Sequence, residues 1–144
     1  MRRAIIRLSL VGAGALGVLI GGSLMFFPKA FLAMSDVFID HDPGLLSELT
    51  APSGILILGG TLMILAATRL RFAPLALFFG AAVYGSYGVA RLVGMALHGI
   101  PSDTLISATI IEVTVATLLT ALGIMSRSDQ SAADMSVHAH QLSA

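Results

Sequence analysis

Four long apolar runs restrict this chain to one class of fold. The first runs from Leu8 to Phe27 without a charged residue, and three more follow at about 43–68, 72–97 and 104–125. A helix of about 20 residues is about 30 Å long, which is the thickness of the hydrocarbon core of a membrane. Only 11% of the residues are charged, whereas a soluble domain has about a quarter. The sequence therefore predicts an all-α integral membrane protein, in which residues 1–125 form an antiparallel four-helix bundle.

Prolines and capping residues predict where these helices begin and end. Pro28 marks the end of the first run. Asp42 precedes Pro43, the pattern of an N-cap with proline at the first helical position. Gly99 is the predicted C-cap of the third helix. A basic start before an apolar run is also typical of a signal peptide, but this run is too long for one, so we predict a retained helix.

Two segments fall outside the four runs. Residues 29–39 are too short to span a membrane, and their apolar residues and scattered charges favour a position at the membrane interface. Residues 126–144 are polar and aperiodic, which predicts a disordered tail. The triplet Asp40-His41-Asp42 contains metal-ligand side chains, but its spacing matches no defined metal loop. We therefore predict no metal site.

The distribution of Lys and Arg predicts the orientation in the membrane. One side of the predicted bundle carries Lys29 alone. The other side carries six basic residues, Arg2, Arg3, Arg7, Arg69, Arg71 and Arg127. Basic residues accumulate on the cytoplasmic side of membrane proteins, so both termini and the tail are predicted to be cytoplasmic.

Glycines in the first run imitate a nucleotide-binding motif. Residues 12–17 read G-x-G-x-x-G, but dinucleotide binding requires a preceding strand and further βαβ units. Here the apolar run continues through the motif, so no nucleotide cofactor is expected. Small residues let membrane helices approach closely. We assign this packing role to Gly17, Gly21, Gly54 and Gly59.

Three charged residues are predicted to lie at similar depths inside the bundle. Measured from the outer helix ends at 1.5 Å per residue, Glu48, Arg91 and Glu112 are about 7, 9 and 12 Å deep. A lone charge at membrane depth costs about 2.5 kcal/mol or more. Pairing is therefore expected, and the five donors of one guanidinium suffice for two carboxylates.

Aromatic and imidazole side chains accompany the arginine on the third helix. Tyr84, Tyr87, Arg91 and His98 are spaced by three, four and seven residues, so they share one helix face. This polar stripe is open to two interpretations. Buried polar pairs can fix helix register, and ionisable residues in membranes also mark binding or proton sites.

These features resemble a known family of small bacterial membrane proteins, the domain of unknown function 4345. The resemblance is carried by the segment Glu48–Gly54 (ELTAPSG), by Arg91 and by Glu112. It implies a four-helix protein of the bacterial inner membrane and no established reaction. The family commonly has Glu-x-Arg and then an aromatic residue at this segment. Thr50 and Ser53 stand at those positions here, which removes one positive charge from the polar layer.

The sequence favours a non-catalytic role. It has no Cys and a formal net charge of +0, so neither thiolate chemistry nor a nucleic-acid partner is expected. No catalytic motif is recognisable, and an enzyme is the less favoured interpretation.

The small size, glycine-lined helices and short loops favour an accessory subunit that packs against a larger membrane complex, or a homo-oligomer. The alternative is a binder or enzyme for an apolar molecule, a quinone or lipid, at the polar stripe. Transport is less favoured because paired broken helices are absent.

Overall fold

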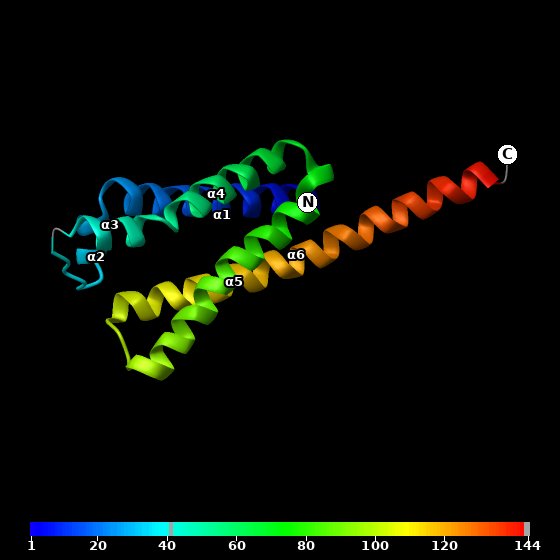
Figure 1. Cartoon of the computed structure of the whole chain (residues 1–144). Coiled ribbons are helices and arrows are strands. Elements are labelled where there is room, and N and C mark those ends of the chain that lie inside the picture. Colours follow the sequence, from blue (N-terminus) through cyan, green and yellow to red (C-terminus); the bar gives the residue numbers. More distant parts are fainter. Residues whose placement is uncertain (41, 143–144) are drawn as a thin grey trace.

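The computed structural model describes residues 1–40 and 42–142, with side-chain surroundings up to Ser128, and in this part of the chain it is all-helical without strands. Figure 1 shows the elements in chain order: α1 (Arg2–Phe26), α2 (Pro28–Ala33), α3 (Pro43–Thr50), α4 (Ser53–Thr68), the 3₁₀ turn η1 (Leu70–Phe72), α5 (Ala73–His98) and α6 (Asp103–Leu142).

Within the described residues, four helical stretches are long and apolar enough to cross a membrane: Arg2–Phe26, Pro43–Thr68, Leu70–His98 and Asp103–Ser128. The prediction of an all-helical chain with four membrane-length helices is therefore confirmed. The predicted cap is also present, because Asp42 Oδ1 accepts hydrogen bonds from the backbone N–H groups of Gly44 at 2.7 Å and Leu45 at 3.1 Å. The middle residue of the Asp40–Asp42 triplet lies outside the described residues.

The second predicted helix is interrupted. A turn at Ala51 and Pro52 separates α3 from α4. Both residues keep right-handed helical backbone angles, and Pro43–Thr68 is one membrane-length stretch, so the helix predicted over 43–68 is kinked rather than ended. The physical reason is Pro52, because proline has no N–H and its ring clashes with the carbonyl four residues earlier. That carbonyl belongs to Glu48, so the interruption also changes where this glutamate is placed.

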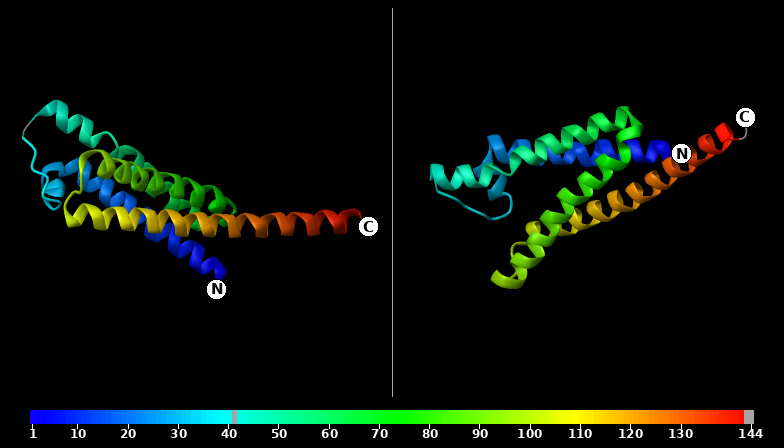
Figure 2. Two further views of the ribbon diagram at one scale, coloured as in Figure 1. Left: turned by 90° about the horizontal axis from the view of Figure 1, so that it is seen from below. Right: turned by 45° about the vertical axis from the view of Figure 1, so that its right-hand side comes forward.

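Two further boundaries differ from the prediction. Helix α1 begins at Arg2 rather than near residue 8, so the basic residues form its first turns. Helix α6 continues to Leu142, whereas residues 126–144 were predicted to be a disordered tail. No Gly or Pro follows Gly123, and alanine, glutamine, methionine and leucine favour helix. Figures 1 and 2 show α6 extending well beyond the other helices.

The long helices associate in two pairs, α1 with α4 and α5 with α6 (Figure 1). Glycines bring the first pair together. A Cβ on Gly14 would lie 2.6 Å from the carbonyl oxygen of Gly60, and one on Gly21 would lie 2.9 Å from the carbonyl oxygen of Ser53. Real side chains do not approach backbone so closely, so only glycine fits at these crossings.

Small residues also bring α5 and α6 together. A Cβ on Gly88 would meet Val113 Cγ2 at 2.9 Å, and the ring of Phe78 lies over Gly123. The two pairs meet mainly where α4 contacts α5. There Met63 packs beneath Gly80 and the ring of Phe79 covers Gly59. Figures 1 and 2 show the pairs diverging from this contact toward the end that holds α2 and α3.

Among the described residues, hydrogen bonds at both ends of the bundle join the two pairs. Arg2 Nη2 donates to the carbonyl oxygen of Met125 at 2.7 Å, and Ser102 Oγ donates to the carbonyl oxygen of Ser35 at 2.9 Å. The first bond lies at the start of α1 and the second joins the α5–α6 connection to the segment after α2. The start of α1 and the region of Met125 in α6 therefore lie side by side, and α6 continues beyond this point.

Candidate functional site

The Arg91 guanidinium and the Glu112 carboxylate form an ion pair between α5 and α6. Arg91 Nε donates to Glu112 Oε1 at 3.1 Å and to Oε2 at 3.0 Å. The glutamate side chain is 14% exposed and the arginine side chain 33%. Two of the three predicted layer residues are therefore in contact.

Local helix geometry explains why this pair forms. A Cβ on Gly88 would lie 3.7 Å from the Cβ of Glu112, so the glycine lets α6 approach one turn before Arg91. Side chains lean toward the N-terminus of their own helix. Arg91 follows Gly88 toward the end of α5, whereas Glu112 lies in the first third of α6. The Arg91 side chain therefore leans back toward Gly88, and the Glu112 side chain leans toward the start of α6, so that the guanidinium and the carboxylate meet.

The geometry leaves most donors of Arg91 unused. The carboxylate is contacted by Nε, whereas a guanidinium carries five N–H donors in all. Among the described residues, no hydrogen bond involves the two terminal nitrogens of Arg91. The common arginine–carboxylate pair is bidentate through two nitrogens, and here the remaining fork stays available for a second acceptor.

Tyr84 has a structural role. It is 6% exposed, and its hydroxyl donates to the carbonyl oxygen of Ala13 on α1 at 2.6 Å. The same hydroxyl lies 3.5 Å from a Cβ placed on Gly17. Tyr84 therefore links α5 to α1 at the glycine-lined crossing, and its donor is already used.

The other members of the predicted stripe lie in different surroundings. Tyr87 is half-buried, and its phenol lies within electrostatic range of both Arg91 and Glu112. His98 is exposed at the last residue of α5, about 10 Å along the helix from Arg91. Of the predicted stripe, Tyr87 and Arg91 thus lie beside Glu112.

Glu48 is not part of this cluster. It is exposed on α3, a helix that packs against α1 and α2, and the described ion pair of Arg91 is with Glu112. The predicted depth of Glu48 assumed a straight helix over 43–68, and the kink at Pro52 removes that assumption.

Three of the four predicted packing glycines lie at helix contacts. Gly17 and Gly21 face α4, and Gly59 faces the Phe79 ring of α5. Gly54 faces open space, because nothing lies within 4 Å of the position that a Cβ would take there. Gly14 and Gly60 form the closest crossing. Both occur in small-residue runs, but the sequence did not show that they face each other.

An exposed face of α6 was also not predicted from the sequence. On one face of this helix the small residues Ser107, Thr114, Thr117 and Ala121 are exposed, and the larger exposed Ile110 and Leu118 lie between them. Only 17% of the most apolar window of α6 is buried inside the chain, against 33% in each of the other three spans. The spacing of seven between residues 107, 114 and 121 is a signal that the sequence offered.

Comparison with known proteins identifies the family and gives no activity. The family model described as Domain of unknown function (DUF4345) matches residues 5–122. The chain therefore belongs to this family, as the resemblance predicted. No curated protein and no solved structure matches it.

Proposed function

We propose that this member of the family is an accessory subunit of the bacterial inner membrane, which packs against a larger membrane protein. In this proposal its four spans are antiparallel, both termini are cytoplasmic, and α2 lies at the outer interface. The exposed small-residue face of α6, made up of Ser107, Thr114, Thr117 and Ala121, carries the proposal.

Small and hydroxyl side chains favour a helix partner over lipid at this face. Membrane helix interfaces are enriched in Gly, Ala, Ser and Thr because these residues let backbones approach and form hydrogen bonds between helices. In this chain the same residue types pack α1 against α4 and α5 against α6. On α6 they remain exposed, which is the pattern expected where a further helix from another chain would pack.

Enlarging this face is expected to release the partner without unfolding the chain. In the Thr114→Leu/Ala121→Leu variant, the amount of co-purifying membrane protein per chain should fall by about tenfold, the effect of losing about 1.4 kcal/mol of binding free energy. Ala82→Leu is the control, because it makes one of the two exchanges, Ala to Leu, at an exposed position of α5. Equal co-purification from both variants would contradict this face as the interface.

The proposed orientation can be tested with single cysteines, since the chain has none of its own. A membrane-impermeant maleimide added to intact spheroplasts is expected to label the Asp40→Cys variant and leave the Ser128→Cys variant unlabelled. Both positions are exposed, and both should react once detergent opens the membrane. Labelling of Ser128→Cys in intact spheroplasts would reverse the proposed topology.

A second candidate function rests on the unused donors of Arg91. A planar guanidinium fork recognises carboxylates, phosphates and other oxygen acceptors, and the half-buried phenol of Tyr87 adds one more polar group beside it. An apolar molecule with an oxygen acceptor, such as a quinone or a lipid, would satisfy both.

The ligand proposal predicts that a small molecule remains bound after gentle extraction. Native mass spectrometry should detect its mass on the wild-type chain and on Arg3→Lys, and not on Arg91→Lys, which keeps the charge but loses the fork. Equal ligand mass on all three proteins would place the molecule elsewhere.

A further inference from the structure

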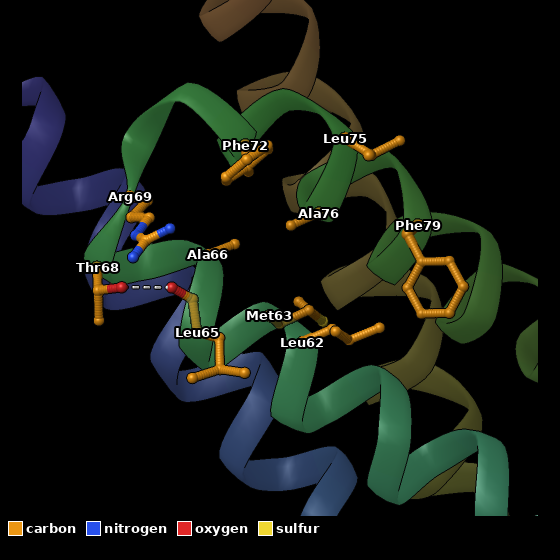
Figure 3. A pocket seen from close by; sticks show the side chains of 10 residues that line it. All are labelled: Leu62, Met63, Leu65, Ala66, Thr68, Arg69, Phe72, Leu75, Ala76 and Phe79. Atoms are coloured by element: carbon orange, nitrogen blue, oxygen red, sulfur yellow. Dashed lines mark hydrogen bonds between the residues drawn. The ribbon is translucent and has the colours of Figure 1, made fainter.

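An apolar groove of about 590 Å³ lies between α4 and α5, at the end of the molecule where η1 connects them (Figure 3). Its floor consists of Met63, Ala66 and Ala76, which are between 2% and 8% exposed. Its walls are large apolar side chains that remain exposed, Leu62, Leu65, Phe72, Leu75 and Phe79. Ligand-binding pockets have volumes of about 300–1,000 Å³, with mostly apolar walls and few polar groups.

The polar part of the groove is at one edge, where Thr68 ends α4 and Arg69 follows it (Figure 3). The Thr68 hydroxyl donates to the carbonyl oxygen of Leu65 at 2.7 Å, so its donor is used. Arg69 is exposed, and among the described residues no ion pair occupies its guanidinium. The guanidinium of the nearby Arg71 lies over the Phe72 ring, 4.5 Å from its centroid. The groove thus combines an apolar channel with positive charge at one end.

We propose that this groove binds an anionic phospholipid of the cytoplasmic leaflet, with one acyl chain between α4 and α5 and the phosphate at Arg69. The proposal rests on the proposed membrane location and orientation. The apolar walls lie along the spans, whereas the charge lies where the span ends. A phospholipid has this same division, with its hydrocarbon in the core and its phosphate at the interface. Basic pockets between membrane helices on the cytoplasmic side bind anionic head groups.

The absence of Trp from the chain allows a direct test. In the Leu62→Trp variant, a single fluorophore stands on the groove wall at a position that is 48% exposed and can accept a larger side chain. The control is Leu8→Trp on α1, which is 75% exposed and outside the groove. Leu8 lies six residues after the start of α1, and Leu62 lies six residues before the end of α4. Each position is therefore about 9 Å from the nearer end of its own helix.

Each variant is reconstituted in phosphatidylcholine vesicles that contain increasing fractions of a lipid with brominated acyl chains, which quenches nearby Trp. The quenching lipid is either phosphatidylglycerol or phosphatidylcholine with the same chains. At Leu62→Trp, half-quenching is expected at an about fivefold lower fraction of phosphatidylglycerol, the effect of one basic residue near the surface. Leu8→Trp stands next to Arg7 and reports the general attraction of anionic lipid to basic residues outside the groove. Adding Arg69→Gln should remove the preference at Leu62→Trp and leave the quenching of Leu8→Trp unchanged.

The possible results distinguish the lipid-site proposal from the proposed membrane location on which it depends. Equal quenching of Leu62→Trp by both lipids, with Leu8→Trp also quenched, would overturn the lipid site and leave the membrane location standing. Failure of both lipids to quench Leu8→Trp would overturn the membrane location as well. Native mass spectrometry of the chain without Trp provides a second readout, because the wild type should retain phosphatidylglycerol and Arg69→Gln should not. Retention by both proteins would also overturn the assignment of the phosphate to Arg69.

Discussion

The Arg91→Leu variant is expected to lose about 2–3 kcal/mol of unfolding free energy, because it leaves the Glu112 carboxylate, which is only 14% exposed, without its cation. Removing one partner of a fully buried pair costs about 3–5 kcal/mol. The smaller loss of about 2–3 kcal/mol is expected for this pair because a third of the arginine side chain is exposed. Reversible unfolding in mixed detergent micelles measures the difference.

The matched variants distinguish a pair from two independent charges. Glu112→Leu should cost less than Arg91→Leu, since a stranded arginine can extend its long stem toward water. The Arg91→Leu/Glu112→Leu variant should recover most of the loss, because an apolar pair of similar volume replaces the ions. If the effects of the two single substitutions simply add in the double variant, Arg91 and Glu112 do not depend on each other.

The second large effect is expected at the closest helix crossing. Gly14→Ala should destabilise the chain by about 1–3 kcal/mol, the usual cost of overpacking, because its new Cβ would lie 2.6 Å from the carbonyl oxygen of Gly60. Gly12→Ala is the control on the same helix, since nothing lies within 4 Å of its Cβ position.

The control substitution should be neutral or should stabilise the chain by up to about 1 kcal/mol, because alanine favours helix over glycine. The same detergent unfolding measurement applies to both variants. Equal stability of the two would mean that α1 and α4 do not pack closely at Gly14 in the membrane.

The spans and the ion pair could be predicted because they follow from local rules. Apolar length predicts a membrane helix, Asp42 before Pro43 predicts a cap, and a charged residue in an apolar run predicts a partner. Arg91 and Glu112 lie on helices joined by a short connection, so their similar depth was enough to predict their contact.

The placement of Glu48 could not be predicted in this way. Equal depth brings two residues together only when their helices are neighbours and straight, and Pro52 interrupts the helix that carries Glu48. The division into two helix pairs depends on which glycines face each other, as Gly14 and Gly60 do. Single-sequence patterns show that small residues are present and do not show which helix they face.

The position at which α6 ends could not be predicted from composition alone. Its last turns are polar, which predicted disorder, but they contain good helix formers and follow directly from a membrane-length helix. Because propagation of a helix is much easier than nucleation, an established helix can continue into a polar segment that would not form one alone.

Native mass spectrometry of the protein, extracted gently from its own membranes, tests the proposed accessory role most directly. This role predicts a stoichiometric complex with a larger membrane protein, which dissociates in the Thr114→Leu/Ala121→Leu variant and persists in Ala82→Leu. A chain that is recovered alone, or only with copies of itself, under conditions that preserve other membrane complexes would contradict the accessory role.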